Sequence, residues 1–361
     1  MTKINRPKFG ENSNGDFTNV LKKRVNAYFE YNQISKKGGS SFVLKAIIMS
    51  LLYLTPLALM FSEIIVHPII QLLMWLIMAV GMSGIGLGVM HDANHGASFK
   101  SAKLNNILGK IIYLVGVDQL NWKIQHNVLH HTFTNIGEHD DSLEVGVLLR
   151  FSPHQKLLKH HKYQHVYAWF LYCLQTIFWS IITDIIRLKK YYKRELTPKN
   201  KSKVRLFLEL FLGKAFYFTA IVVLPIIFLK NPWWLTLTFF LIMHLSAGLF
   251  LSCVFQPAHI MPDNEFPLPS KSGNIKSDWL VHQIVTSCNF ATTNKLFSWF
   301  VGGLNYQIEH HLFPNICNKH YPEISVILKQ TVKEYNIPYR DYPTFWSAIK
   351  EHGKMLKLLG S

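Results

Sequence analysis

Long apolar stretches alternate with polar, basic segments along the 361 residues of the chain. Four stretches are long enough to cross a membrane, because a hydrocarbon core of about 30 Å takes roughly 20 apolar residues in a helix. They cover residues 46–66, 69–90, 206–229 and 234–256. Only a few residues, including Pro68, separate the first stretch from the second, and only a few, including Pro232, separate the third from the fourth. The pattern therefore predicts an all-α integral membrane protein with four transmembrane helices in two tight hairpins.

Two further apolar stretches, residues 107–117 and 167–186, do not fit a simple crossing. The first is too short, and the second contains Gln175 and Asp184 and ends in basic residues. A single crossing by the second would also place the histidine clusters described below on opposite sides of the membrane. We expect both stretches to form interfacial amphipathic helices.

Basic residues near the ends of the spans predict the orientation. Residues 1–41 hold eight Lys and Arg against three Asp and Glu, whereas the two hairpin tips hold one Lys between them. The positive-inside rule places both termini and the segments 91–205 and 257–361 in the cytoplasm. We expect a cytoplasmic N-terminal arm (1–41), a membrane domain with a cytoplasmic helical cap (42–322) and a cytoplasmic C-terminal segment (323–361). The arm has no apolar core of signal-peptide type, so the first span is the expected insertion signal.

Composition narrows the class of partner. The net charge is +17, from 38 Lys and Arg against 21 Asp and Glu. In a membrane protein such an excess is typical of loops that face anionic lipids. No basic stripe lies on a recognisable nucleic-acid-binding module, so nucleic acid is not an expected partner. The four cysteines form no CxxC pair and are expected as reduced thiols.

Eight of the 18 histidines gather in four short motifs on the predicted cytoplasmic side. The motifs HDANH, HNVLHH, FQPAH and QIEHH contain His91, His95, His126, His130, His131, His259, His310 and His311. Residues i and i+4 share a face of a helix, so the pairs 91/95 and 126/130 can each offer two imidazoles to one ion. His131 is turned about 100° from His130 and can reach a second ion. Neutral imidazole suits Fe, Zn, Cu and Ni. Eight histidines are too many for one ion and suit two.

The remaining histidines have other expected places. The dense run at 154, 160, 161 and 165 lies among lysines and is expected at the membrane interface. His139, His320 and His352 are expected on the surface, His67 at an outer hairpin tip, and His244 in a buried polar contact within the fourth span. His282 is open between a metal ligand and a substrate-pocket residue.

The set HDANH, HNVLHHTFTN and NYQIEHHLFP resembles the three histidine boxes of membrane fatty acid desaturases, and the resemblance runs over residues 81–322. The third box begins with Gln307 where many members have His, which is similar to front-end and related bacterial acyl desaturases. The resemblance implies two iron ions, O2 as co-substrate, and introduction of a C=C bond into an acyl chain. It implies the eight histidines as ligands, with His259 as the extra ligand after the fourth span. The bacterial inner membrane is the expected location.

The resemblance also implies supporting residues and partners. Gln307 would be a polar or water-mediated neighbour of iron. Side chains beside the boxes would fix imidazole tautomers, and the candidates are Asp92, Asn127, Asn135, Asp141 and Glu309. Aromatic residues would line an apolar substrate tunnel, and the candidates are Trp122, Trp279, Phe290 and Trp299. The substrate would be a fatty-acyl-CoA or an acyl-lipid within the membrane.

Electrons must come from elsewhere, because the chain has no HPGG motif and the N-terminal arm is too short for a cytochrome b5 domain. A ferredoxin or a separate cytochrome b5, with its reductase, is implied. Two alternatives stay open. A fatty-acyl or lipid hydroxylase would begin with the same C–H cleavage. A metal transporter fits less well, because the histidine clusters lie outside the spans and few ionisable residues (Lys45, Glu63, Glu209, Lys214, His244) come near the apolar blocks.

Overall fold

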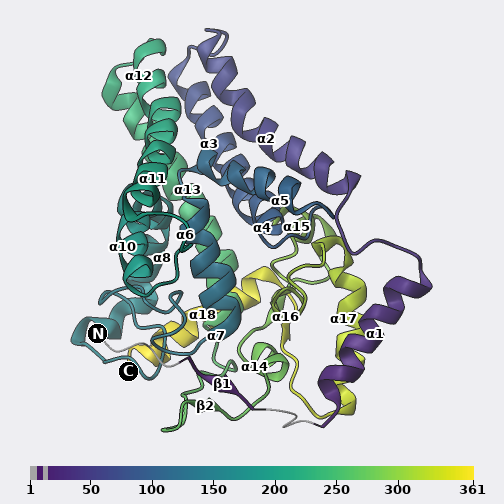
Figure 1. Ribbon diagram of the computed structural model, residues 1–361. Helices are drawn as coiled ribbons and strands as arrows, with labels where there is room; N and C mark the ends of the chain where they lie inside the picture. The colour runs from purple at the N-terminus through teal and green to yellow at the C-terminus, as the bar shows by residue number, and fades with distance from the viewer. Residues whose placement is uncertain (1–5, 11–14) are drawn as a thin grey trace.

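The computed structural model describes residues 6–10 and 15–361, and the described chain is mostly helical (Figure 1). The α-helices are α1 (Phe17–Tyr31), α2 (Ser40–Phe61), α3 (Pro68–Gly84), α4 (Met90–Asn94), α5 (Ala102–Gly109), α6 (Gln119–Lys123), α7 (His131–Phe133), α8 (Gln164–Cys173), α9 (Gln175–Phe178), α10 (Asp184–Lys193), α11 (Lys203–Phe218), α12 (Leu224–Phe228), α13 (Trp233–His259), α14 (Trp279–Val285), α15 (Lys295–Phe300), α16 (Gln307–Leu312), α17 (Tyr321–Glu334) and α18 (Phe345–Leu359). Turns of π-helix cover Ile85–Val89, Ile124–His130, Trp179–Thr183 and Thr219–Val223, and 3₁₀ turns cover Lys110–Val115, Lys159–Tyr163 and Asn318–His320. The strands are β1 (Lys8–Phe9), β2 (Asn274–Ile275), β3 (Asn289–Phe290) and β4 (Asp341–Tyr342).

Four continuous helical stretches are long and apolar enough to cross a membrane. They are Ser40–Phe61, Pro68–Asn94, Lys203–Phe228 and Trp233–His259, which confirms the four predicted spans. Each pair forms a hairpin, and the two connections lie at the same end of the molecule, beside the α12 label in Figure 1. Large apolar side chains on the outer faces of these helices are exposed, such as Leu51, Ile69 and Phe211. Apolar faces of this extent are favourable in contact with lipid tails and unfavourable in contact with water.

The two stretches predicted to be interfacial are short or bent. Residues 107–117 belong to α5 and a 3₁₀ turn that ends at Gly116, whose φ of 75° lies in the left-handed region that glycine adopts readily. Residues 167–186 fall in a helix pair, Lys159–Cys173 and Gln175–Lys193, that bends by 54° at its break. The pair is apolar enough to count as a fifth, broken span, and its interfacial placement stays a prediction.

A buried ion pair ties this bent segment to the third span. Lys214 of α11 lies 2.5 Å from Asp184 Oδ2 and also donates to the carbonyls of Gly116 and Trp179. A lone ammonium within an apolar block would be costly, and these three acceptors satisfy its three donors. The pair therefore fixes where the chain at 116–118 and at 179–184 lies.

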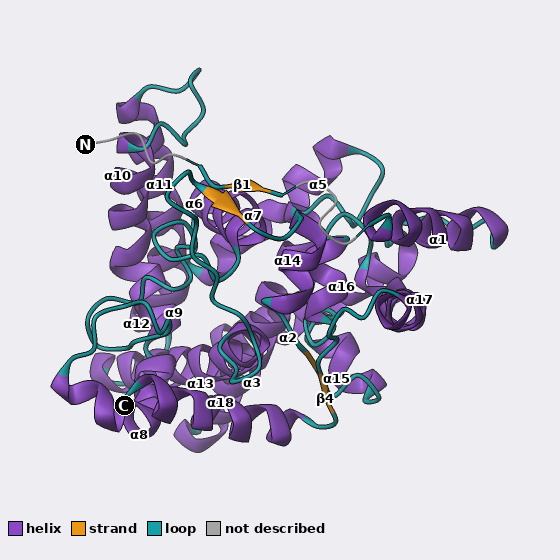
Figure 2. Cartoon of the chain, turned by 90° about the horizontal axis from the view of Figure 1, so that it is seen from below, coloured by secondary structure: helices purple, strands orange, loops and turns teal. Residues whose placement is uncertain are grey.

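At the other end of the spans, helices α1, α14, α16, α17 and α18 and two short parallel strand pairs, β1 with β2 and β3 with β4, form a cap (Figures 1 and 2). Helix α1 lies beside α17, and α18 runs past α8 and α13. The expected surface positions of His320 and His352 are wrong, because both are buried. His352 bonds the Tyr172 hydroxyl and the Ile260 carbonyl, so it docks α18 against the spans. His161, expected at the interface, is also buried and contacts the Val147 carbonyl.

Candidate metal centre

The eight histidines of the four motifs come together between the ends of the spans and the cap. Those of the first motif lie in and directly after α4, those of the second in the π-helical turn Ile124–His130 and at the start of α7, and those of the third in α16, while His259 is the last residue of α13. All are buried except His95, which is partly buried. Segments far apart in the sequence thus deliver imidazoles to one enclosed place.

Seven of the eight rings sort into two groups that could each hold an ion. The first group is His91, His95, His126 and His310, and the second is His130, His259 and His311. Within each group the ligand nitrogens lie within 4.8 Å of one another. His131 lies between the groups: its Nε2 is 3.2 Å from that of His126 and 3.0 Å from that of His310, and its ring stacks on His311 at 4.3 Å.

The expected sharing of one ion by His126 and His130 is wrong, because the two rings belong to different groups. The reason is local backbone geometry. Residues Ile124–His130 form a π-helical turn, in which the hydrogen-bond repeat is i to i+5. His126 therefore meets His131, five residues on, and His130 turns toward His259 and His311. The pair His91 and His95 does share a group as its spacing predicts.

The spacing of the ring nitrogens fits metal ligation. Imidazole nitrogens bind an ion such as zinc at about 2.1 Å, so two of them at right angles lie about 3.0 Å apart. The Nε2 atoms of His91 and His126 are separated by 2.9 Å. The Nε2 atoms of His95 and His130 are buried and have no hydrogen-bond partner among the described residues. A buried nitrogen left in this way is costly unless something else binds it.

The protonation states also suit ligands. Burial lowers the pKa of His95, His126, His131, His310 and His311 well below the usual value, and neighbouring imidazoles lower it further. These rings are therefore neutral at physiological pH, with a lone pair free for an ion. The donor set, all nitrogen and without cysteine, is one that imidazole-binding first-row metals such as iron accept.

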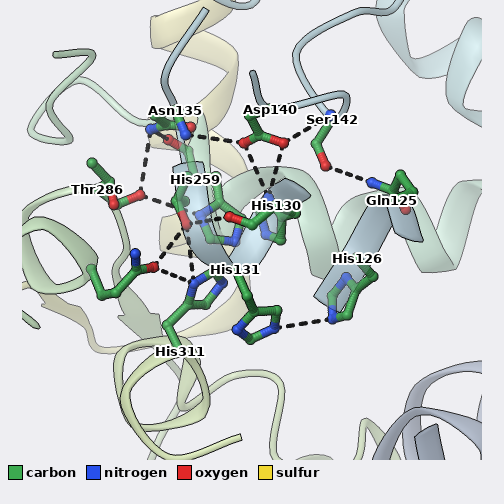
Figure 3. A network of polar contacts seen from close by, with 12 residues as sticks. Gln125, His126, His130, His131, Asn135, Asp140, Ser142, His259, Thr286 and His311 are labelled. Atoms are coloured by element: carbon green, nitrogen blue, oxygen red, sulfur yellow. Dashed lines mark hydrogen bonds and ion pairs between the residues drawn. The ribbon is translucent and has the colours of Figure 1, made fainter. Parts of the chain in front are cut away.

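Four of the ligand candidates are held through Nδ1, which leaves Nε2 facing the group (Figure 3). His130 Nδ1 lies 3.0 Å from Asp140 Oδ2, and His259 Nδ1 lies 3.2 Å from the Thr286 carbonyl. His311 Nδ1 lies 2.7 Å from Gln283 Oε1, and His310 Nδ1 lies 3.3 Å from the Tyr321 hydroxyl. Such partners fix the tautomer and the orientation of a ligating ring.

The carboxylate of Asp140 is itself well supported. Burial would raise the pKa of Asp140, but its electrostatic interaction and hydrogen bond with His130, with the hydrogen bonds from the backbone N–H groups of Ser142 and Asn135, lower it below the usual value. Both N–H groups lie within 3.0 Å of the carboxylate (Figure 3). An ionised Asp140 accepts from His130 Nδ1–H and raises the basicity of Nε2.

A cavity of about 620 Å³ reaches the first group of histidines. His91, His126 and Gln307 line it on one side, and most of its wall is apolar, with residues such as Ile112, Val115 and Phe255. Arg187 and Lys190 also line it, beside Glu144, which is exposed. The volume and lining suit a long hydrocarbon chain that carries a polar end.

The comparisons with known proteins agree with this geometry. The fatty acid desaturase family model matches residues 68–343. The sn-1 linoleoyl-lipid 6-desaturase of Synechocystis sp. is 31% identical over 95% of both chains. The protein of that name from Arthrospira platensis is 33% identical over 94% of this chain and 92% of its own. The acyl-lipid (8-3)-desaturase of Physcomitrium patens is 33% identical over 98% of this chain and 73% of its own.

This chain belongs to the fatty acid desaturase family. It is an integral membrane oxidoreductase and a fatty acid desaturase, so the transporter alternative is set aside. The family uses a metal, and the two histidine groups are where this desaturase could bind it.

Of the residues expected to support the imidazoles, some lie against the histidine rings and others bond to groups elsewhere. The Gln307 amide is in place, with Nε2 at 2.9 Å from His259 Nε2 and 3.2 Å from His311 Nε2. Asp92 Oδ1 lies 3.9 Å from His91 Nδ1, and its other oxygen accepts from Asn318. Asn135 holds the His259 carbonyl rather than a ring.

Three others bond to groups outside the histidine set. Asn127 donates to the Asn94 carbonyl, Glu309 accepts from Asn289 and Tyr339, and Asp141 accepts from Lys190 and Tyr191. Sequence reasoning missed Asp140 and Gln283, each one position from a residue that it named. The adjacent acids at 140 and 141, and the Gln that follows His282, were the available signals.

His282 and the aromatic candidates are also placed. His282 is buried 5.0 Å from the Phe9 ring and belongs to neither histidine group. Of the four tunnel candidates, Trp122 lines the large cavity and stacks on His126 at 4.4 Å. The other three do not line it: Trp279 donates to the His131 carbonyl, Phe290 packs in the core beside β4, and Trp299 lines a second cavity.

Proposed function

We propose that this desaturase acts on lipid-bound acyl chains that already contain unsaturation, and that it adds a C=C bond on the carboxyl side. The three relatives described above are named for lipid-bound substrates, one as an acyl-lipid (8-3)-desaturase and two as sn-1 linoleoyl-lipid 6-desaturases. The observation that carries the proposal is the apolar cavity of about 620 Å³ whose wall includes His91, His126 and Gln307. A CoA thioester as the carrier is the second candidate, because Arg187 and Lys190 at the cavity wall could also pair with its phosphates.

Two iron ions are the proposed occupants of the histidine groups. His91, His95, His126 and His310 would hold one, and His130, His259 and His311, with Gln307 beside them, would hold the other. His131, whose ring contacts both groups, would be a further ligand. Bound iron with O2 supplies the hydrogen abstraction from an unactivated CH2 that protein side chains cannot perform.

The protein's own part is to position and enclose. The carbonyl, carboxylate, amide and hydroxyl groups behind the rings keep each imidazole turned toward the ions. The apolar wall excludes water and holds the acyl chain with one C–C bond near His91 and His126. Trp122, stacked on His126, limits how the chain can lie beside that ring.

Desaturation consumes O2, two electrons and two protons, and converts CH2–CH2 to CH=CH with release of two molecules of water. We propose a separate one-electron carrier, a ferredoxin or a cytochrome b5 with its reductase, as the source of the electrons. The positive-inside rule supports a cytoplasmic active site and cytoplasmic termini. We propose a bacterial inner membrane as the location. We also propose residues 42–322 as the membrane domain, flanked by cytoplasmic segments 1–41 and 323–361.

The proposal is tested by expression in a host with a reductase system, followed by lipid-class separation and location of double bonds by mass spectrometry. A new double bond in a phospholipid- or glycolipid-bound chain is expected, and His130→Ala should abolish it. His67→Ala, at an exposed hairpin tip, is the matched control and should leave the product unchanged. An oxygen-bearing product would indicate the hydroxylase instead, and accumulation of product only as the CoA ester would favour the second carrier.

A further inference from the structure

A second cavity, of about 200 Å³, lies at the beginning of the first membrane span. Its polar lining includes three lysines and two serines (Lys45, Lys295, Lys319, Ser41 and Ser298), with Asn318 and Tyr306. No Asp or Glu lines it. It shares no lining residue with the large cavity near the histidines, so it is a separate site.

Lys45 is the unusual member of this set. Its side chain is buried, with 4% of the residue exposed, and its Nζ donates to Asn318 Oδ1 at 3.3 Å. Among the described residues, no carboxylate lies within ion-pair distance of this Nζ, in contrast to Lys214, which pairs with Asp184. The buried carboxylate of Asp92 attracts the ammonium from a greater distance, across the Asn318 side chain that bonds both groups. An ammonium has three donors, and one long bond to an amide leaves most of that capacity unused. A buried cation without an anion in direct contact is costly, and an anionic group in the cavity would lower that cost.

The rim of the cavity provides further donors. Lys319 donates to the Gly38 carbonyl at 3.0 Å and keeps two donors, and Lys295 is exposed at the start of α15. Helix α2 begins at Ser40 without a side-chain cap, so the positive end of its dipole also faces this region. Three cations and two hydroxyls around so small a space form a site for one anionic group with several acceptor oxygens, such as a phosphate.

The surroundings point to a lipid as the source of that phosphate. Leu44 on α2 and Leu296 on α15 are 59% and 76% exposed, so the protein surface beside the cavity is apolar. Trp299, 37% exposed, lines the cavity and lies under the Lys45 ammonium at 5.6 Å. Tryptophans beside basic residues at the end of a span are typical of the headgroup region, where anionic lipids occupy basic pockets between helices.

We propose that this cavity binds the phosphate of an anionic phospholipid, with the ammonium of Lys45 as its buried partner and Lys295 and Lys319 at the rim. The acyl chains of this lipid lie along the exposed apolar faces of α2 and α15. The lipid is bound beside the catalytic site and is not the substrate. Its binding does not depend on the proposed choice of acyl carrier.

The test is titration of the purified iron-loaded protein in neutral detergent with phosphatidylglycerol or phosphatidylcholine, with bound lipid counted by native mass spectrometry. Phosphatidylglycerol should bind selectively. Lys45→Met should weaken it at least tenfold. Lys295→Gln and Lys319→Gln should each weaken it about fivefold, which corresponds to about 1 kcal/mol for each charge near the surface. The control Lys103→Gln, an exposed lysine on α5 outside the cavity, should bind as the unmodified protein does.

Three results would overturn the proposal. They are equal binding of the two lipids, unchanged binding by Lys45→Met, or full displacement of phosphatidylglycerol by inorganic phosphate, which would make the site one for free phosphate. If Lys45→Met does not fold, the double variant of Lys295 and Lys319 decides, because both side chains lie at the rim. Iron content measured on the same samples should stay constant, which separates loss of lipid from damage to the histidine groups.

Discussion

Replacing Asp140 by Asn tests whether the support behind one imidazole controls metal binding. The carboxylate accepts from His130 Nδ1 and from the backbone N–H groups of Asn135, at Oδ2, and of Ser142, at Oδ1. Whichever way an amide is turned, its NH2 group faces one of these backbone N–H groups. One buried donor then loses its partner, which costs about 1–3 kcal/mol of folding free energy. The negative charge that fixes the His130 tautomer is lost as well.

The loss of this partner should weaken iron binding about 10- to 100-fold, or by about 1.4–2.7 kcal/mol, as is usual for groups that orient a metal ligand. The assay is competition with a graded series of chelators, with iron per protein measured by mass spectrometry. Asp141→Asn is the matched control, since this neighbouring buried acid bonds Lys190 and Tyr191 and no histidine. It should lower the unfolding temperature by a similar amount and leave the iron affinity unchanged. Equal iron affinity in Asp140→Asn and the unmodified protein would refute the assigned role of Asp140.

Three further predictions address pH, packing and the cavity. Burial and the Asp184 charge raise the pKa of Asp118 from 3.8 to about 6, so the stability that this group contributes is complete below pH 3.8 and is lost as the pH rises through 6. Asp118→Asn keeps the helix cap, and thermal unfolding should show that the variant lacks this part of the pH dependence. Gly248→Ala should destabilise the protein by about 1–3 kcal/mol, because the new Cβ would lie 2.3 Å from the Cys173 carbonyl oxygen. In the control Gly86→Ala, the new Cβ would meet only Leu251 at 3.4 Å, so the unfolding temperature should stay unchanged. Gly86→Leu should fill part of the large cavity, so product profiling should show preference for shorter acyl chains, and an unchanged profile would contradict the placement of the substrate there.

The membrane spans were predictable because their signal is strong and local. About 20 consecutive apolar residues have few other stable arrangements. The predicted ranges 46–66 and 234–256 fall close to the helices Ser40–Phe61 and Trp233–His259. The bent segment was harder, because hydropathy measures length and apolarity but not a change of direction. The segment bends by 54° between Cys173 and Gln175, and its second half is held against the third span by the Lys214–Asp184 pair, which joins residues 30 positions apart.

The gathering of the eight histidines at one candidate metal centre was also predictable, because four histidine motifs at the ends of apolar blocks have few other functions. The residues behind the rings were not. Asp140 and Asp141 are adjacent and both are buried, yet only the first faces His130. A turn of the chain at Asn135, whose φ of 59° is in the left-handed region, brings Asp140 back toward the second box. Sequence alone does not specify such a turn, so choosing between neighbouring acids requires the fold.

The division of the rings into two groups depends on one further feature, the π-helical turn at Ile124–His130. In a regular α-helix, His126 and His130 would share a face and His131 would point away from it. Two of the three imidazoles would then face one metal position. The wider turn directs His126 toward His91 and His310, directs His130 toward His259 and His311, and leaves His131 within 3.2 Å of the first group while it stacks on the second. One short segment thus contributes to both metal positions and to the space between them. A second π-helical turn, Ile85–Val89, immediately precedes α4 and so sets the rotation of His91 about the helix axis. Both turns interrupt the regular i to i+4 hydrogen bonding of helices that are otherwise continuous. In each case, the histidines in or after the turn point in directions that a regular helix of 3.6 residues per turn would not give them.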